Sequence, residues 1–355
     1  MKKWQPTNYD YCQKHQLFVK EVREKKLCTL ECVVAEGVCE HNHLKDPHIR
    51  GEGVKRIIVT GSSGSIGTRL VEALHSKGYT VLGYDQKESS VKDSPILKTW
   101  IGDFTDKDNV LAIFNLANPD VCYHLGAVTD VNWARMHPFE TVMINVVGTM
   151  NVAYACMTHD VLLNYVSSCA VYGKTPEHPS REESLKMPAE IYGCTKLAAE
   201  RIIEGFASVS KLRYNIARPS TGIGEGMRRV LAPYLFLEKA WKNEHISIHG
   251  SGLQTRPFVY LGDIVDGLVR LADANCNEAF NFAGTKDVSV LELADKCLGM
   301  FGRDVREYVD FTADRPGQVM DEVIDSSKAK RVLGWTPKVS VDEALRKTVK
   351  WMKTE

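Results

Sequence analysis

The chain has 355 residues, of which 44% are hydrophobic and 25% are charged, and its 45 basic residues balance its 45 acidic residues. A net charge of zero gives the molecule no general attraction to nucleic acid or to an anionic membrane, so any anionic ligand must be met by local charges. The sequence has no apolar run of the roughly 18 residues typical of a membrane helix, and its first residues are too charged for a signal peptide. These features predict a cytoplasmic protein that binds neither membrane nor nucleic acid.

Residues 1–53 differ from the rest because they hold four of the ten cysteines and four of the eleven histidines. Thiolates and imidazoles together suit tetrahedral zinc, which makes four of these residues candidate ligands, namely Cys28, Cys32, Cys39 and His41. Their spacing matches no established zinc motif, so we expect no metal. The alternative is an N-terminal extension that packs on the catalytic part of the chain or on a partner subunit.

Residues 54–220 alternate short apolar runs with helical patterns. The runs occupy residues 55–60, 79–85, 96–101, 121–125, 161–168 and 212–219. Nearly continuous apolar strands that alternate with helices indicate a parallel sheet covered on both faces, which predicts an α/β fold of the Rossmann, doubly wound type. Residues 221–355 are less regular. We expect them to form mainly a smaller C-terminal substrate lobe, with one segment near 255–282 returning to the Rossmann sheet.

A glycine-rich turn follows the first expected strand and precedes an amphipathic helix, as a dinucleotide fingerprint requires. The turn supplies Gly61, Gly64, Ser65, Ile66 and Gly67 as candidate cofactor contacts. The helix N-terminus that follows offers amide donors and a partial positive charge to a pyrophosphate. The next strand ends about 20 residues later in Asp85, whose carboxylate suits ribose hydroxyls and repels a 2′-phosphate. The pattern therefore predicts NAD rather than NADP.

Three further residues have side chains suited to proton transfer. Tyr192 and Lys196 are four residues apart at the start of an expected helix, so both project from one face. An ammonium beside a phenol stabilises the phenolate, which predicts a lowered pKa for Tyr192 and a role in moving protons. Ser168 ends the strand expected at 161–168, at the edge where open α/β sheets bind ligands.

The segments GSSGSIG, HLGA, SSCAVYG and YGCTK, in this order, resemble the motifs of the extended short-chain dehydrogenase/reductase family, whose best-known members act on nucleotide sugars. The resemblance covers about residue 54 to the C-terminus. It implies Ser168 as the catalytic serine, Tyr192 as the acid/base, and Lys196 as its partner and a ribose ligand. It also implies cofactor contacts from Asp103, Phe104, Leu125, Gly126, Ala127, Asn145 and Pro219. Family members commonly pair through two long helices each, which implies a homodimer.

The residues that follow Ser168 bear on the reaction. Family members that dehydrate or decarboxylate their substrates place an acidic residue there, whereas this chain has Cys169 and Ala170. The pattern is similar to that of the 4-epimerases, which implies transient oxidation at carbon 4 of a nucleotide sugar with NAD retained as a catalyst. The alternatives are an NAD-dependent nucleotide-sugar dehydrogenase or reductase, less so a dehydratase, and a non-catalytic NAD-binding protein.

The resemblance also implies where the substrate binds. Arg256 and Arg315 match the family's arginines for the diphosphate, and a guanidinium fork suits bidentate phosphate binding. Thr129, Ser168 and Thr221 complete the expected substrate contacts, although Thr221 stands where many sugar-nucleotide enzymes have asparagine. We expect the base pocket to be lined by Arg228, Arg229 and the helix at residues 233–242.

Overall fold

A computed structural model describes residues 54–88, 99–314 and 319–354. The chain divides between Val54 and Lys55 into two units, and the description below concerns the second of them. The candidate zinc residues Cys28, Cys32, Cys39 and His41, and the candidate phosphate ligand Arg315, lie outside the described residues.

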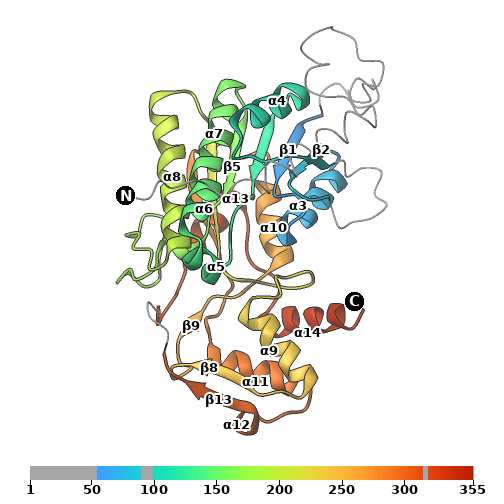
Figure 1. Cartoon of the computed structure of the whole chain (residues 1–355), viewed down its shortest axis with the longest axis vertical. Helices are drawn as coiled ribbons and strands as arrows, with labels where there is room; N and C mark the ends of the chain where they lie inside the picture. The colour runs from blue at the N-terminus through green and yellow to red at the C-terminus, as the bar shows by residue number, and fades with distance from the viewer. Residues whose placement is uncertain (1–53, 89–98, 315–318, 355) are drawn as a thin grey trace, which may run out of the picture. The chain divides into compact units, whose positions relative to one another are not determined.

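A parallel sheet of seven strands forms the centre of this unit (Figure 1). The strands run in the order β11-β6-β5-β4-β1-β2-β3, and every neighbouring pair is parallel. Their bounds are Arg56–Thr60 (β1), Thr80–Asp85 (β2), Thr99–Ile101 (β3), Val121–His124 (β4), Leu162–Val166 (β5), Tyr214–Pro219 (β6) and Glu278–Phe282 (β11). The predicted Rossmann-type α/β fold is confirmed.

Helices cover both faces of the sheet, which explains the continuous apolar strands. In β1, Ile57 and Val59 enter one hydrophobic core with helices α3 (Ser65–Ser76) and α10 (Leu261–Arg270). Ile58 points the other way, into a second core. That core contains α4 (Lys107–Ala117), α7 (Thr149–Thr158) and α8 (Ile191–Val209). Because successive side chains of a strand alternate between faces, a strand buried on both sides needs apolar residues at every position.

The carboxyl ends of β1 and β4 meet where the strand order reverses, at the point where doubly wound sheets bind their ligands. Gly61 turns the chain out of β1 with a φ of +70°, and a Cβ there would lie 2.6 Å from the backbone nitrogen of Gly126. A Cβ on Gly67 would lie 2.0 Å from the carbonyl oxygen of Gly61. Any side chain at either position would therefore push apart the two loops or the turn and its helix.

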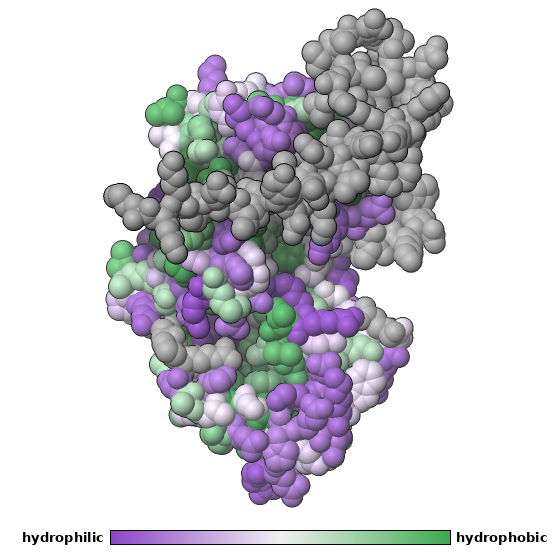
Figure 2. Space-filling view, viewed as in Figure 1, coloured by the Kyte–Doolittle hydropathy of each residue, from purple (hydrophilic) through white to green (hydrophobic). Residues whose placement is uncertain are grey.

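A smaller lobe, called the C-terminal lobe here, lies beyond this edge of the sheet (Figure 1). It contains α9 (Ala232–Lys242), β8 (Ile246–His249), α11 (Val290–Gly299), α12 (Val305–Tyr308) and β13 (Val309–Thr312), and β8 pairs with β13 in parallel. Its outer surface is mostly hydrophilic in the view of Figure 2. Short ladders join β7 (Gly222–Ile223) to β10 (Val259–Tyr260) and β9 (Thr255–Arg256) to β12 (Val288–Ser289).

Part of the chain beyond the sixth strand returns to the sheet. Helix α10 packs against α3, and β11 forms an edge of the sheet beside β6. Helix α13 (Ser327–Leu333) then packs on β11, and the buried ring of Trp335 meets Phe282 edge to face at 4.9 Å between ring centroids. The last helix, α14 (Val341–Met352), packs beside the β7–β10 ladder.

One helical run is long and apolar enough to match a membrane span by length and composition. It comprises residues Pro138–Thr158, which form α6 (Pro138–Val142), the π-helical turn η3 (Met143–Gly148) and α7. Half of its most apolar window is buried inside the protein, as in a helix that covers a sheet.

Candidate active site

A cleft of about 970 Å³ is lined by the carboxyl edge of the sheet and by the C-terminal lobe. Most of the residues proposed from the sequence line it, and they are Gly61, Gly64, Ser65, Ile66, Gly67, Asp85, Phe104, Leu125, Gly126, Ala127, Thr129, Ser168, Tyr192, Lys196, Pro219, Thr221 and Arg256. The fold thus brings together, in one cavity, segments that are up to two hundred residues apart in the sequence.

Two proposed cofactor contacts, Asp103 and Asn145, are absent from the cleft lining of the described chain. The carboxylate of Asp103 accepts hydrogen bonds from the backbone and hydroxyl of Thr105, each at 2.8 Å. The buried amide of Asn145 accepts from the nitrogen of Val128 at 2.7 Å and donates to the carbonyl of Val128 and the hydroxyl of Thr195. In this structure Asn145 therefore ties the cleft wall at Val128 to helix α8.

The glycine-lined half of the cleft fits a dinucleotide. Helix α3 begins here and has no side-chain cap, so its first amides face the cavity without a side-chain acceptor. Asp85 ends β2 at the same edge and also accepts a hydrogen bond from the Ser63 nitrogen at 3.0 Å. The buried hydroxyls of Ser167 and Ser220 line the cleft and have no hydrogen-bond partner among the described residues. Buried polar groups are normally satisfied, so these two favour a polar ligand in the cavity.

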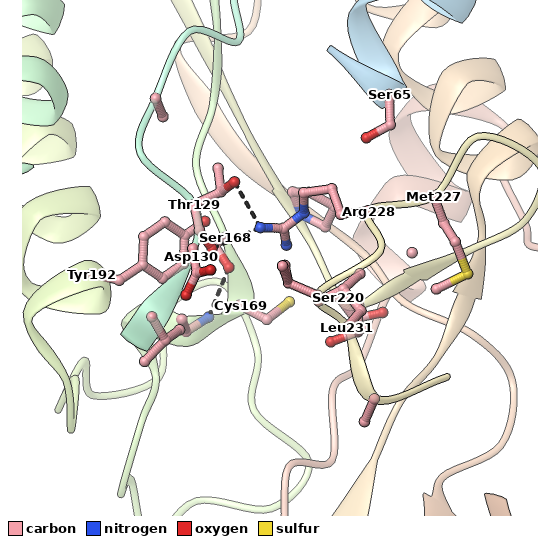
Figure 3. Close-up of a pocket in the computed structure, with 18 of the residues that line it drawn as sticks. Ser65, Thr129, Asp130, Ser168, Cys169, Tyr192, Ser220, Met227, Arg228 and Leu231 are labelled. Atoms are coloured by element: carbon pink, nitrogen blue, oxygen red, sulfur yellow. Dashed lines mark hydrogen bonds between the residues drawn. The ribbon is translucent and has the colours of Figure 1, made fainter. Parts of the chain in front are cut away.

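Ser168 and Tyr192 approach each other across the cleft floor (Figure 3). Ser168 lies two residues after the end of β5 and caps the short helix η4 (Cys169–Val171), its oxygen accepting from the Ala170 nitrogen at 3.2 Å. Tyr192 lies in the first turn of α8. Burial raises the pKa of Tyr192, while hydrogen bonding with Ser168 and the charge of Arg228 lower it. The sequence predicted a lowered pKa, and in this structure the cost of burying a phenolate is the larger effect.

Lys196 lies one helical turn after Tyr192 and is almost fully buried. Its ammonium donates to the carbonyl of Val166 at 2.8 Å and lies 4.8 Å from the ring centroid of Tyr165. Burial lowers the pKa of Lys196 to about 7, and the nearby Glu200 raises it. The groups that lower the pKa of Tyr192 in this structure are Ser168 and Arg228, while the ammonium of Lys196 donates to a backbone carbonyl.

A buried ion pair includes Glu200, which lies one turn after Lys196 on helix α8. The Arg218 guanidinium donates to Glu200 from two nitrogens, at 3.0 and 2.8 Å, and both side chains are at most 3% exposed. A third nitrogen donates to the hydroxyl of Tyr172 at 2.9 Å and to the carbonyl of Glu182 at 3.0 Å. The sequence reasoning missed Glu200, although its position four residues after Lys196 on the same helix was the available signal.

The charged side chains at the substrate end of the cleft have different partners. Arg135 pairs with Glu190 at 2.6 Å. Arg256 lies 3.6 Å from Glu322, and burial raises the pKa of Glu322 while Arg256 lowers it. Arg228, which was expected in the base pocket, lines the cleft and donates to the carbonyl and the hydroxyl of Thr129, at 2.7 and 2.6 Å. Glu322 was not anticipated from the sequence, because it follows the expected Arg315 segment without a motif of its own.

Comparison with known proteins gives consistent results. The model of the NAD dependent epimerase/dehydratase family matches residues 57–283. Mouse dTDP-D-glucose 4,6-dehydratase is 30% identical over 320 residues, which cover 85% of this chain and 89% of the mouse protein. The crystal structure of UDP-glucose 4-epimerase from Thermotoga maritima with UDP-glucose has a TM-score of 0.80 at 26% identity, covering 84% of this chain and 99% of that one. MoeE5 in complex with UDP-glucuronic acid and NAD has a TM-score of 0.76 at 28% identity, with coverages of 84% and 99%.

These matches span the sheet, the cleft and most of the C-terminal lobe. The cleft also contains the glycine turn and the side chains of Ser168, Tyr192 and Lys196, on which the resemblance to the family was based. The chain therefore belongs to the NAD-dependent epimerase/dehydratase family, and its cofactor is NAD.

Proposed function

We propose that the chain is a nucleotide-sugar 4-epimerase. The observation that carries this proposal is the surroundings of Ser168. Elimination of water or loss of carbon dioxide beside a transient ketone calls for an acid next to the catalytic hydroxyl, as the resemblance implies for such enzymes. Here the neighbouring positions hold Cys169 and Ala170.

The buried thiol of Cys169 is engaged elsewhere. It donates to the carbonyl of Arg218 at 3.1 Å, and burial raises its pKa well above the usual range. The carboxylate of Asp130, which also lines the cleft, caps helix α5 (Val131–Met136) by accepting from the nitrogens of Asn132 and Trp133. Neither group favours dehydration, whereas proton exchange at a single hydroxyl needs only Tyr192 and Ser168.

In the proposed reaction Tyr192 takes the proton of the 4-hydroxyl while Ser168 holds the same oxygen by a hydrogen bond. When bound, NAD would supply the hydride acceptor for carbon 4. The 4-keto sugar then turns over in the cleft, so that the hydride given back to its opposite face, with the proton returned from Tyr192, inverts carbon 4. Lys196, placed one turn below Tyr192, supports the proton transfer and holds the ribose. The Thr129, Thr221 and Ser220 hydroxyls, which line the same cavity, orient the sugar, and Arg256 binds the diphosphate.

The first test is made without added cofactor. Purified full-length protein is denatured to identify the released dinucleotide, and native protein is incubated with UDP-, GDP-, CDP- and dTDP-sugars. The proposal expects bound NAD and inversion at carbon 4 of one sugar, read by NMR. Accumulating NADH would indicate the dehydrogenase alternative, and a 4-keto-6-deoxy product would indicate a dehydratase. Bound NAD with no turnover of any sugar would indicate a non-catalytic protein.

The second test removes one hydroxyl. Tyr192→Phe should lower kcat by about 10² to 10⁴, the usual contribution of general acid–base catalysis, while NAD stays bound. Tyr214→Phe is the matched control, because Tyr214 begins β6 and is not among the residues that line the cleft. Full activity in Tyr192→Phe would contradict the proposal.

We also propose that two copies of the chain pair through α6, η3, α7 and α8. Large apolar side chains of α6 and η3 are exposed, notably Phe139 at 83%, Met143 at 49% and Val142 at 43%. An apolar surface of this kind is typical of an interface. Sedimentation of the full chain should give twice the monomer mass, and Phe139→Glu should shift it toward monomer. Phe311→Glu, at an exposed phenylalanine of β13 in the C-terminal lobe, should not.

A further inference from the structure

The relatives compared above include complexes with a neutral sugar and with an acidic one. Family membership therefore leaves open the charge of the sugar that this chain accepts. The charged side chains of the cleft decide between these classes, because a buried or half-buried charge calls for an opposite charge.

Two of the cleft's arginines have acidic partners within the protein. Arg135 pairs with Glu190, and Arg256 lies beside Glu322. Arg228 differs from both. Within the described part of the chain, its hydrogen bonds come from one terminal nitrogen, Nη1, and both go to neutral oxygens of Thr129. No carboxylate of the described residues forms an ion pair with it.

A guanidinium carries five N–H donors in a planar fork and keeps its charge at every accessible pH. The side chain of Arg228 is half-buried and lines the cleft, so part of its hydration is already lost. With only one nitrogen engaged, most of its donors remain available to a ligand. An anion that accepts from two of them would gain a bidentate, charge-assisted contact.

The position of Arg228 assigns this anion to the reacting end of the substrate. Figure 3 shows its guanidinium reaching from the loop that contains Met227 and Leu231 toward Thr129, on the side of the cavity where Ser168 and Tyr192 lie. The charge of Arg228 is also close enough to lower the pKa of Tyr192. A group bound there is therefore part of the sugar that reacts at Tyr192.

Neutral donors surround the same space. The hydroxyls of Thr129, Ser220 and Thr221 line the cleft, and the buried Ser220 oxygen has no partner among the described residues. A carboxylate has about four lone-pair sites and accepts from a guanidinium and from hydroxyls at once. A sugar hydroxymethyl group in this position would leave the charge of Arg228 without a counterion.

We infer that the substrate is a nucleotide-activated uronic acid, whose sugar carboxylate is bound by Arg228 with the hydroxyls of Thr129 and Ser220. This inference rests on the proposed epimerase function, because it places the carboxylate on the sugar that Tyr192 and Ser168 act upon. It assigns to Arg228 the discrimination between acidic and neutral sugars that share one nucleotide.

The test compares sugars that differ only in this group. The full chain with its bound NAD is assayed with UDP-glucuronic acid and UDP-glucose, and with the dTDP-, GDP- and CDP-linked pairs. We expect the uronate of one pair to have the higher kcat/KM by about tenfold or more. Arg228→Gln should reduce the value for the uronate by about 10- to 100-fold, as loss of a charge-assisted hydrogen bond implies, and change the neutral sugar by less than about threefold.

Two further variants sharpen the result. Arg228→Lys keeps the charge but loses the fork and should fall between the wild type and Arg228→Gln. Arg201→Gln removes an exposed arginine of α8 that does not line the cleft, and it should change neither sugar. Binding of the free nucleoside diphosphate should be the same in Arg228→Gln and in the wild type.

The outcomes separate the two proposals. A preference of the wild type for the neutral sugar would overturn the role of Arg228. Equal losses of kcat/KM for both sugars in Arg228→Gln, together with weaker binding of the nucleoside diphosphate, would also overturn it and would place Arg228 at the diphosphate. If no sugar of the panel is epimerised but Arg228→Gln still selectively weakens binding of the uronate, the proposed reaction fails and the recognition of a carboxylate stands.

Discussion

Arg218 and Arg228 are close neighbours in the sequence, yet their guanidinium groups have opposite surroundings. Arg218 is 3% exposed and uses all three nitrogens, in hydrogen bonds to Glu200, Tyr172 and the carbonyl of Glu182. Arg228 is half-buried, lines the cleft and uses one nitrogen, toward neutral oxygens of Thr129.

The difference separates an arginine that completes the fold from one that remains available to a ligand. Burial alone would lower the pKa of Arg218, but the hydrogen bonds and charge of Glu200 outweigh it and raise the pKa above its usual range. Arg218 therefore keeps its charge, and its contacts with Glu200 hold β6 to α8. Arg228 has no comparable partner among the described residues, so its donors can serve a substrate.

The largest effect expected from this comparison is on stability. Glu200→Gln leaves the buried charge of Arg218 uncompensated, and breaking a buried ion pair in this way costs about 3–5 kcal/mol. Urea unfolding should show this loss. The matched variant Arg228→Gln should lower the free energy of unfolding by less, about 1–2 kcal/mol at most, because it loses hydrogen bonds to Thr129 but leaves no buried charge unpaired.

A double variant distinguishes the cost of an unpaired buried charge from the cost of any substitution at this buried site. Arg218→Met combined with Glu200→Met removes both charges, and such replacements are often close to neutral. It should be more stable than Glu200→Gln alone. Equal stability of the wild type and Glu200→Gln, or a large loss in Arg228→Gln, would mean that the two arginines do not differ as described.

The elements of the fold that the sequence could predict are those whose burial leaves a repeating pattern of apolar residues. The strands of the sheet were predictable because each is buried on both faces, which requires apolar residues at successive positions, as in Ile57, Ile58 and Val59. The two-residue strands of the C-terminal lobe, such as Thr255–Arg256, are too short to have a period. The π-helical turn Met143–Gly148 also has no composition that distinguishes it from the α-helix on either side.

The candidate site likewise contains residues that local motifs predict and partners that they do not. The glycine turn, Ser168, Tyr192 and Lys196 follow strand ends or begin a helix, so local motifs place them at one edge of the sheet. The partners of Glu200 and Arg228 come from distant elements, and no local pattern specifies them. The raised pKa of Tyr192 was also beyond the sequence, because it depends on how deeply the folded chain buries the phenol.

A smaller effect is expected at Lys196, a buried charge whose ammonium faces a carbonyl and a ring rather than a bidentate partner. Burial lowers its pKa from 10.5 to about 7 in the folded chain. At pH values between these two limits the unfolded state binds a proton that the folded state does not, so stability rises with pH across this window. The maximal slope is about 1.4 kcal/mol per pH unit for one proton.

Urea unfolding of the wild type and of Lys196→Met between about pH 7 and about pH 8.5 measures this contribution. The wild type should gain about 1–2 kcal/mol relative to the variant over that interval, because methionine has no proton to lose. Other groups that titrate in this range are shared by the two proteins and cancel in the difference. Parallel curves would mean that Lys196 keeps an ordinary pKa, as it would if Glu200 were its ion-pair partner rather than that of Arg218.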